Sequence, residues 1–442
     1  MKHLTKTLYV AGCRCPKLLW LKYHDKGRPV DKLTQYNFDS GYSVERMAYR
    51  LFPNGIMMDK ERFSLDELCK RTEKVMLGQP DFLFQGAFQS GGILCISDVL
   101  TRRENGWDLS EIKMSANTKV EHIQDVAFQS YCLAKCHVEV IGKYVVHTNT
   151  EYIKRGEINP SELFIAEDVG ERVDLELQKV PENIHSFQTL LEKPKYPHQP
   201  MGKQCKYPNR CPYLEYCLSE DRTLHNSGNE IIINRSAISE FLSRIESPVY
   251  FLDFETHQPA IPVFNFTRPY QNVPFQYSLH VLNGTLDHFA FLASNREDPR
   301  RLLAESLLSH IGKKGSLVAW NAIFEAGVIK GLAETFPDLR TELLALLPRF
   351  IDLMVPFRKK FFSHPGFNGS CSLKNVLPIL VPALDYKNMV INKAEDAYLA
   401  YHAYVNGDID DAGWQIAQKG LLGYCGLDTA GMVVILDLLK KL

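Results

Sequence analysis

Three cysteines in one short segment constrain this chain more than any other feature. They are Cys205, Cys211 and Cys217, with five residues between neighbouring members. Thiolates this close together are typical metal ligands, but three of them leave a tetrahedral set incomplete. A fourth ligand is therefore expected from elsewhere in the chain, and the metal would tie that part of the sequence to this segment.

The number of cysteines and the net charge indicate the cellular compartment and limit how the chain could bind a nucleic acid. Eleven cysteines in 442 residues are too few for a disulfide scaffold, and an odd number cannot pair completely within the chain. A reducing cytoplasm is therefore expected. The formal net charge is −1, so local basic patches and metal ions, rather than a global positive field, would have to hold a nucleic acid. No apolar run approaches the roughly 18 residues of a membrane span, so no membrane partner is expected.

The length of the chain and one polar stretch predict two domains. A chain of 442 residues can bury two or three hydrophobic cores. Residues 218–229 follow the third cysteine, are polar and lack clear periodicity, which is typical of a linker. The predicted domains are residues 1–225 and 226–442. Because helical and strand patterns occur in both, the predicted fold class is α/β.

A predicted hairpin in the first half brings two acids and a lysine together. Residues 93–100 have a strand pattern that ends near Asp98, and residues 107–113 form the returning strand. Glu111 and Lys113 are two residues apart, so their side chains point to the same face. Carboxylates can hold a divalent metal ion, and a lysine beside them can orient water or steady a phosphoryl charge. Taken alone, the pattern fits a surface hairpin with an ion pair equally well.

The segment after the hairpin decides between these interpretations. Residues 120–136 have a helical pattern that places Gln129 two residues before a tyrosine, and a strand is predicted over residues 138–147. An aspartate, then Glu-X-Lys, then a helix with a Gln-X-Tyr step resembles the core of the PD-(D/E)XK nucleases. The likeness is to their RecB-like branch, which includes the CRISPR-associated iron–sulfur nucleases. The resemblance implies a metal-dependent catalytic site made of Asp98, Glu111, Lys113 and Gln129, with Asp98 and Glu111 as metal ligands.

The early helix departs from this resemblance. A helix is predicted over residues 39–51, where many RecB-like members carry a histidine and this chain has Glu45. Two interpretations remain open. Glu45 is either a third carboxylate of the catalytic site or a solvated residue on the helix surface.

The resemblance also supplies the missing thiolate. In the CRISPR-associated nucleases, one cysteine near the N-terminus and three near the end of the domain bind a [4Fe-4S] cluster. Here Cys15 matches the first, and Cys205, Cys211 and Cys217 match the others. Such a clamp closes a long loop, where the gain in chain entropy is largest. Zinc is the alternative metal, because four thiolates bind it as well, and Cys13 is the alternative to Cys15.

The second half carries a different pair of acids. Residues 249–256 are apolar except around Asp253 and Glu255, as expected of a strand covered on both faces. The two carboxylates project from one face, whereas Phe254 projects from the other. Two buried carboxylates repel each other unless a cation lies between them, and this predicts a metal site.

Further candidate residues follow at the starts and faces of predicted helices. A strand over residues 316–320 leads into a helix that starts near Glu325. The helical region 412–442 holds Tyr424 and Asp428, which are one turn apart and share a face. Asp352 is a further acid, with a capping or core-edge role as the simpler interpretation.

The order of these residues resembles the DEDD exonucleases in their tyrosine-containing, DnaQ-like form. The resemblance assigns Asp253 and Glu255 to the first motif, Glu325 to the second, and Tyr424 with Asp428 to the third. Most members have aspartate in the second motif, so Glu325 is a departure by one methylene group. The resemblance implies two Mg²⁺ or Mn²⁺ ions held by the four carboxylates, with the tyrosine orienting the attacking water. It also implies removal of nucleoside monophosphates in the 3′→5′ direction.

Both resemblances together cover most of the chain, which resembles a DUF2779-type protein. They imply a PD-(D/E)XK restriction-endonuclease-like domain with a four-cysteine clamp, followed by an RNase H-like domain of DnaQ type. The implied activity is metal-dependent hydrolysis of DNA, in DNA repair or in defence. Two alternatives remain open: an RNA 3′→5′ exonuclease with only the C-terminal site active, and a nucleic-acid-binding protein whose nuclease centres have decayed.

Overall fold

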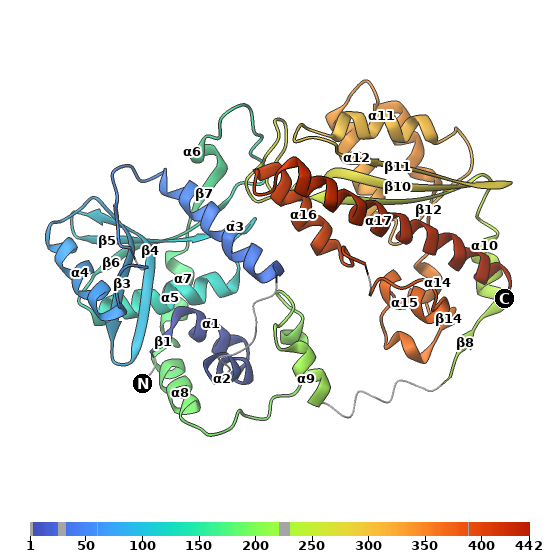
Figure 1. Ribbon diagram of the computed structural model, residues 1–442. Coiled ribbons are helices and arrows are strands. Elements are labelled where there is room, and N and C mark those ends of the chain that lie inside the picture. The colour runs from blue at the N-terminus through green and yellow to red at the C-terminus, as the bar shows by residue number, and fades with distance from the viewer. Residues whose placement is uncertain (1–2, 25–31, 60, 221–229, 388) are drawn as a thin grey trace. The chain divides into compact units, whose positions relative to one another are not determined.

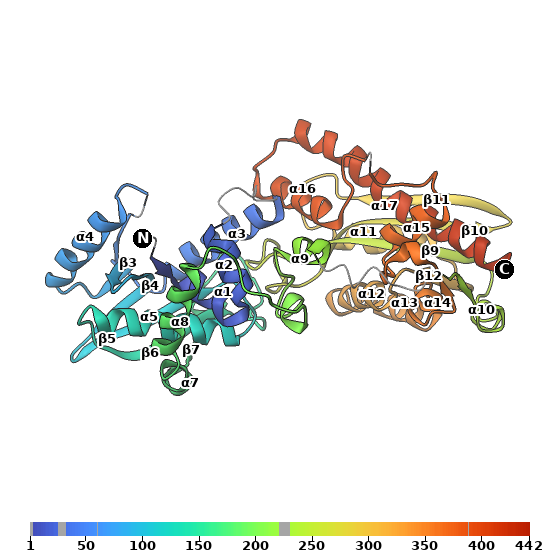
Figure 2. The same ribbon diagram turned by 90° about the horizontal axis from the view of Figure 1, so that it is seen from below.

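The computed structural model describes residues 3–24, 32–59, 61–220, 230–387 and 389–442 (Figure 1, Figure 2). The chain divides into two compact units, Met1–Arg222 and Thr223–Leu442, close to the expected boundary at residue 225. Each unit has its own sheet and its own buried core, and each mixes helices with strands, which confirms the α/β class. Of the predicted linker, residues 218–220 end a helix, and residues 221–229 lie outside the described residues.

The first unit is built on a seven-stranded sheet in the order β2-β3-β4-β5-β6-β7, with β1 beside β4. The strands are β1 (Leu4–Thr5), β2 (Ile56–Met57), β3 (Phe82–Ser90), β4 (Ile93–Arg103), β5 (Gly106–Lys113), β6 (Val140–Thr148) and β7 (Phe164–Asp168). Strands β3, β4 and β5 form an antiparallel meander, and α5 (Val120–Lys135) then crosses over so that β6 runs parallel to β5. The predicted hairpin and crossover helix are confirmed. The prediction that the strand ends near Asp98 is wrong, because the polar residues Thr101 to Arg103 pair with β5 and β4 extends to Arg103.

Helices cover this sheet and carry the cysteine segment. They are α1 (Lys6–Arg14), α2 (Pro16–His24), α3 (Lys32–Tyr49), α4 (Leu65–Leu77), α6 (Pro160–Leu163), α7 (Gly170–Leu177), α8 (Val180–Leu191), the 3₁₀ turn η1 (Lys203–Cys205) and α9 (Leu214–Glu220). Helix α5 packs on the sheet, and α1 and α7 pack against α5 (Figure 1). Tyr9 of α1 stacks on Phe128 of α5 with ring centroids 4.9 Å apart. Cys15 caps α1 and directly precedes α2.

The second unit is built on a five-stranded sheet in the order β11-β10-β9-β12-β13. The strands are β9 (Val249–His257), β10 (Val273–Asn283), β11 (Thr285–Leu292), β12 (Ser316–Ala319) and β13 (Phe350–Asp352), and a separate small sheet pairs β8 (Ile232–Ile233) with β14 (Phe362–Ser363). Strands β9 to β11 are antiparallel, whereas β12 is parallel to β9 and β13 to β12. The central strand β9 thus has a neighbour at each edge, and its residues alternate between two buried cores, so both faces are covered as its apolar sequence predicts.

Helices lie on both faces of this sheet. They are α10 (Arg235–Leu242), α11 (Arg300–His310), α12 (Ile323–Thr335), α13 (Arg340–Leu346), α14 (Val355–Arg358), α15 (Leu373–Leu380), α16 (Ala394–Asn406) and α17 (Asp411–Lys440), with 3₁₀ turns η3 (Leu347–Arg349) and η4 (Pro365–Phe367). Val249 and Phe251 of β9 pack in the core that includes α17, while Tyr250, Leu252 and Phe254 pack with α11, α12 and α13. The prediction that Phe254 points away from the acidic face is confirmed.

Helix α17 is the one helix in the described part of the chain that is long and apolar enough to cross a membrane. An 18-residue window of α17 reaches a mean hydropathy of 1.5. In the fold, however, α17 lies along the sheet, where it contacts β9 and β10 (Figure 1) and buries Trp414, Leu421 and Met432. Its apolar composition is therefore accounted for by its place in the core of the second unit.

Candidate functional sites

The first candidate site lies where β4 and β5 separate. The antiparallel register between these strands runs from Arg103 and Gly106 to Val99 and Ser110. At the next position, Asp98 Oδ2 accepts a hydrogen bond from the backbone nitrogen of Ile112 at 2.9 Å. The carboxylate thus takes a backbone donor at the end of the ladder, and this fixes Asp98 beside the acids of β5.

The sequence pattern predicts that three side chains lie together, and the structure places Glu111 in hydrogen-bond contact with Lys113 and Gln129. Lys113 Nζ lies 2.6 Å from Glu111 Oε1 and 2.6 Å from Asp125 Oδ2. Gln129 Nε2 donates to Glu111 Oε2 at 2.7 Å and to Asp125 Oδ1 at 3.0 Å. Asp125 was missed, although its i, i+4 spacing to Gln129 on α5 puts both on one helical face and is readable from the sequence.

A second lysine, also missed, lies between the acids. Lys6 Nζ is 3.3 Å from Asp98 Oδ1 and 2.8 Å from Glu111 Oε1. The two-residue strand β1 pairs with β4 at Ile93 and Leu94, and α1 begins at Lys6 directly afterwards. The short strand therefore carries the amine into the gap between β4 and β5. A strand of two residues has no readable periodicity, so the sequence gives no signal for this contact.

Burial and the two lysines set the charges of this site. Burial raises the pKa of Asp98 to about 7, and the charge of Glu111 adds to the effect. Burial also acts to raise the pKa of Glu111, but the charges of Lys113 and Lys6 outweigh it and hold this pKa well below its usual range. One firmly ionised carboxylate therefore lies between two ammonium groups, beside a carboxyl whose charge depends on pH near neutrality.

Glu45 lies near this site on α3. Its Oε1 accepts hydrogen bonds from Tyr49 and from Gln85, and its charge contributes to the raised pKa of Asp98. Gln85 has a φ of 55°, which is unusual for a residue other than glycine, and the register between β3 and β4 is the same on both sides of it. Glu45 is half-buried and hydrogen-bonded, which does not fit a freely solvated helix residue.

The four predicted clamp cysteines line one pocket. Cys15, Cys205, Cys211 and Cys217 all border a space of about 400 Å³, part of which is open to solvent. Burial raises the pKa of Cys217; Lys17 opposes this effect, and the other three thiols reinforce it. Cys13 is placed differently, since its sulfur lies 4.0 Å from Asn183 Nδ2.

Polar contacts hold the cysteine segment against the first two helices. Arg14 donates to the backbone oxygen of Gln204 at 2.8 Å and to that of Asn209 at 2.6 Å. Lys17 Nζ lies 2.6 Å from Glu220 Oε2 and 4.5 Å from the centre of the Tyr196 ring. Cationic groups therefore flank the pocket, where they would offset the negative charge of thiolates.

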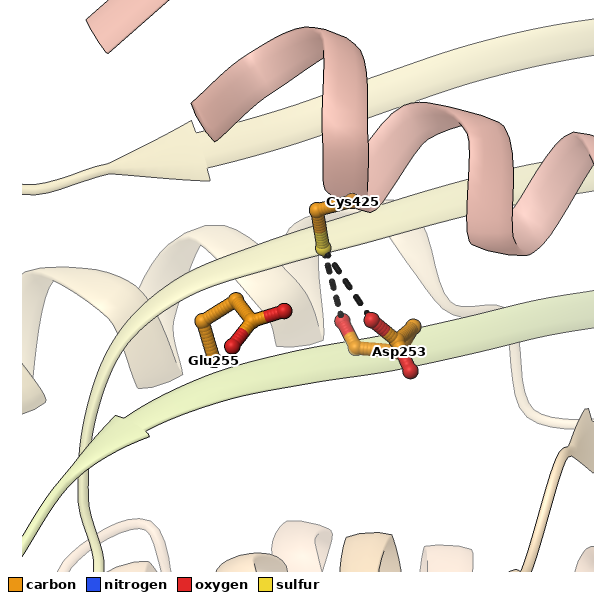
Figure 3. A group of neighbouring side chains, drawn as sticks. All are labelled: Asp253, Glu255 and Cys425. Atoms are coloured by element: carbon orange, nitrogen blue, oxygen red, sulfur yellow. Dashed lines mark hydrogen bonds between the residues drawn. The ribbon is translucent and has the colours of Figure 1, made fainter. Parts of the chain in front are cut away.

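The second candidate site gathers acids from β9 and α17. The ligand atoms of Asp253, Glu255 and Cys425 all lie within 4.8 Å of one another (Figure 3). Asp428, one turn further along α17 from Tyr424, is buried and accepts a hydrogen bond from Tyr386 at 2.6 Å. Alternation along β9 and the helical turn of α17 thus bring the first and third predicted motifs to one place.

Glu325 comes to the same site from the first turn of α12. Its side chain is 2% exposed, and its Oε2 has no hydrogen-bond partner among the described residues. Its charge acts on Glu255, and that of Asp253 acts on it. Asp352 is used otherwise: it accepts from the backbone nitrogen of Asn321 at 3.1 Å and pairs with Arg358 at 3.0 Å. Neither α12 nor α14, the helices that begin beside it, has a side-chain cap hydrogen bond, so these contacts do not confirm the capping interpretation of Asp352.

Two aromatic residues and one lysine border these acids. Tyr424 is 1% exposed, and its ring centroid lies 6.0 Å from that of Tyr386. Lys374 Nζ lies 4.6 Å from the centre of the Tyr424 ring, and its charge opposes the burial that raises the pKa of Asp428. Tyr386 was missed because it stands outside any predicted helix or strand. Cys425 was also missed, although it stands three residues before Asp428 on α17 and this spacing puts both on one helical face.

The charges of the second site are poorly compensated. Burial raises the pKa of Asp253 to about 8, with the charge of Asp428 adding to it. Burial likewise raises the pKa of Asp428 to about 6. The pKa values of Glu255 and Glu325 are raised by burial and by the neighbouring Asp253. Three of these carboxylates are buried and that of Asp253 is half-buried. Four neighbouring carboxylates that resist ionisation together are the donor set expected of a divalent-cation site, because a cation would remove their repulsion.

Comparison with known proteins found a family match, which lies in the second unit, and a relative that is similar over part of the chain. Residues 250–372 match the family described as "Domain of unknown function (DUF2779)", which confirms that part of the resemblance. The matched span includes Asp253, Glu255 and Glu325. A protein of Ureaplasma parvum serovar 3 (strain ATCC 700970), described as "Uncharacterized protein UU173", is 26% identical over 236 residues. This similarity covers 48% of the present chain and 34% of the relative, so the chain spans about a third of that protein's length.

Proposed function

We propose that this protein is a metal-dependent nuclease whose second unit is a DnaQ-like 3′→5′ exonuclease of RNase H-like fold. The observation that carries the proposal is the group of Asp253, Glu255 and Cys425 within 4.8 Å, with Asp428 and Glu325 beside it. The central position of β9, between an antiparallel pair and two parallel strands, agrees with that fold. Hydrolysis of a phosphodiester at a carboxylate-bound cation is the chemistry such a donor set supports.

The residues of the second site would have different roles in hydrolysis. The four carboxylates would hold Mg²⁺ or Mn²⁺, which when bound supplies an activated water and stabilises the leaving 3′ oxygen. Tyr386 donates to Asp428 and fixes its orientation. Tyr424, which lies beside these acids, would hold the attacking water by its hydroxyl group. Lys374 brings positive charge toward the incoming phosphate.

We further propose a RecB-like hydrolytic site of PD-(D/E)XK type in the first unit. The specific observation is the network in which Glu111 is bound by both Lys113 and Gln129, beside Asp98. Lys113 is held by two carboxylates, so its amine is positioned and remains charged, as is needed to stabilise a developing phosphoryl charge. Asp98 and Glu111 would hold the ion there.

The four-cysteine pocket supports a structural cluster in the first unit. Four thiolates on one zinc ion lie about 3.8 Å apart, given Zn–S bonds of about 2.3 Å. Among the residues that the structure describes, no three of the clamp cysteines lie within 4.8 Å of one another. In an iron–sulfur cluster each thiolate binds a different iron, which leaves the thiolates further apart. A [4Fe-4S] cluster is therefore the better fit, and iron and sulfide analysis of anaerobically purified protein tests it against zinc.

The test of function is degradation of matched, 5′-labelled DNA and RNA strands in the presence of Mn²⁺. Asp253→Asn should abolish stepwise shortening from the 3′ end, and Glu111→Gln should abolish whatever cleavage remains. The matched control for the second unit is Glu334→Gln, an exposed glutamate on the same helix as Glu325. The control for the first is Glu139→Gln, which is also exposed.

The alternatives give different results in the same assay. Shortening of RNA but not of DNA, insensitive to Glu111→Gln, would identify an RNA exonuclease with only the second site active. Binding of nucleic acid without cleavage and without Mn²⁺ binding in calorimetry would identify a protein whose nuclease centres have decayed. Activity that survives both Asp253→Asn and Glu111→Gln would refute the two-site proposal.

A further inference from the structure

Cys425 places a thiol inside the acid group of the second unit. It projects from α17 toward β9, and its sulfur lies 3.3 Å from Asp253 Oδ2 and 3.7 Å from the Asp253 backbone oxygen (Figure 3). The side chain is completely buried. Cys425 lies between Tyr424 and Asp428 on α17, so the same helix positions the thiol and the carboxylate of Asp428.

A second observation points to a ligand in this place. Glu325 is buried, and one of its carboxylate oxygens has no hydrogen-bond partner among the described residues. Its charge acts on Glu255, so it faces the same acid group. A buried oxygen without a donor costs free energy, and a cation shared with Asp253 and Glu255 would remove that cost.

We propose that Cys425 is itself a ligand of the divalent cation held by Asp253 and Glu255, which makes this a mixed oxygen–sulfur site that prefers Mn²⁺, Fe²⁺, Co²⁺ or Zn²⁺ to Mg²⁺. This inference rests on the proposed function, because it concerns the ion of the same site. Thiolates are soft ligands that Mg²⁺ does not favour, whereas transition metals accept sulfur and carboxylate oxygen together. Binding would release the thiol proton to solvent.

The observed separation suits two donors to one ion. With metal–oxygen bonds of about 2.1 Å and metal–sulfur bonds of about 2.3 Å, donors at a right angle lie about 3.1 Å apart and donors at a tetrahedral angle about 3.6 Å. The distance of 3.3 Å from sulfur to Asp253 Oδ2 lies between these values. The side chains therefore need no rearrangement for both to bind the same ion.

The competing interpretation is that the thiol only donates a hydrogen bond to Asp253. A serine in its place would then donate in the same way and leave the preference among metal ions unchanged. If the sulfur is a ligand, the same substitution replaces a soft donor by a hard one. The ratio of the affinity for Mn²⁺ to the affinity for Mg²⁺ should then fall at least about tenfold.

The experiment uses the full chain, purified anaerobically with its four-cysteine clamp filled, and titrates it with Co²⁺. The expected result is a near-ultraviolet sulfur-to-cobalt charge-transfer band that is present in the parent protein and absent in Cys425→Ser and Cys425→Ala. Cys371→Ser, which changes a half-exposed thiol of the same unit, is the matched control and should keep the band. Calorimetry with Mn²⁺ and with Mg²⁺ then gives the affinity ratio.

The outcomes separate this inference from the proposed function. Loss of the band in both Cys425 variants, together with a lowered Mn²⁺-to-Mg²⁺ ratio in Cys425→Ser, supports the inference. If the parent protein binds Co²⁺ without a charge-transfer band, and the Asp253→Asn variant no longer binds Co²⁺, the metal site is supported and the thiolate ligand is refuted. If Asp253→Asn binds Co²⁺ as tightly as the parent, the metal site itself is refuted. Even if a Cys425 variant fails to fold, a parent protein that binds Co²⁺ without the band refutes the thiolate ligand.

Discussion

Replacing Cys15 by serine should destabilise the first unit and leave the second unchanged. Cys15 caps α1, whereas the other three clamp cysteines follow about 190 residues later. Removing this one ligand therefore opens the long loop that a metal at the clamp would close. Cys211→Ser leaves Cys15, Cys205 and Cys217 in place and should have the smaller effect.

The magnitude follows from the length of the loop. The chain-entropy relation for a cross-link over about 190 residues gives about 5 kcal/mol. The contacts of Arg14 with Gln204 and Asn209, and of Lys17 with Glu220, hold the same segments and remain in the variant. We therefore expect Cys15→Ser to lower the free energy of unfolding of the first unit by about 3–5 kcal/mol. Cys13→Ser, two residues away, should cost about 1 kcal/mol.

The assay is hydrogen exchange at increasing urea concentration, read by mass spectrometry on peptides from each unit of the full chain. Peptides from α1, α2 and α9 should lose protection at lower urea in Cys15→Ser than in the parent, while those from β9 and α17 should not. Equal protection of α1 and α9 in parent and variant would refute the clamp. If Cys13→Ser loses the cluster iron and Cys15→Ser keeps it, the fourth ligand is Cys13 and the assignment of Cys15 is refuted.

Three further predictions concern the two acid sites. Because the folded-state pKa values of Asp253 and Asp428 are raised to about 8 and about 6, the folded second unit keeps protons that the unfolded chain has released above about pH 4. Its melting temperature without metal should therefore fall as the pH rises from 5 to 8, and saturating Mn²⁺ should abolish this fall in calorimetry. Lys6→Met should raise the affinity of the first unit for Mn²⁺ by about tenfold, since Lys6 competes with a cation for Asp98 and Glu111. The affinity is measured by titration with Mn²⁺ in an Asp253→Asn background, and an unchanged affinity would contradict this prediction. Tyr386→Phe removes the hydrogen bond to Asp428, worth about 1.5–3 kcal/mol, and should lower kcat at least tenfold with little change in KM; an unchanged kcat would show that Tyr386 only packs.

Residues that share one periodic element could be predicted from the sequence. Glu111 with Lys113, and Asp253 with Glu255, follow from the alternation of a strand, and the structure places each pair on one face. Asp125 was within reach of the same reasoning, because it stands one helical turn before Gln129. The strand and helix positions around these residues were predicted to within a few residues for the same reason.

Residues that enter a site from a distant element could not be predicted in this way. Lys6 reaches Asp98, which is 92 residues away, through a two-residue strand that carries no periodic signal. Tyr386 reaches Asp428 from a segment between two helices. Cys425 shares a helical face with Asp428, but its contact with Asp253 of β9 depends on how α17 packs on the sheet. These contacts are set by tertiary packing, which a single sequence does not encode in any local spacing.

The two sites differ in how their acids are compensated, and this difference has a consequence for cation binding. In the first unit, Asp98 and Glu111 are paired with Lys6 and Lys113, so the acids are neutralised by the chain itself. In the second, the charge of Lys374 acts on Asp253, Glu255 and Asp428 and does not prevent burial and mutual repulsion from raising their pKa values. The pKa of Glu325 is raised by burial and by the charge of Asp253. A divalent cation therefore removes a large repulsion in the second unit, whereas in the first it must displace an amine that already satisfies the acids. Metal binding should accordingly stabilise the second unit more than the first, and the first site should need the higher metal concentration.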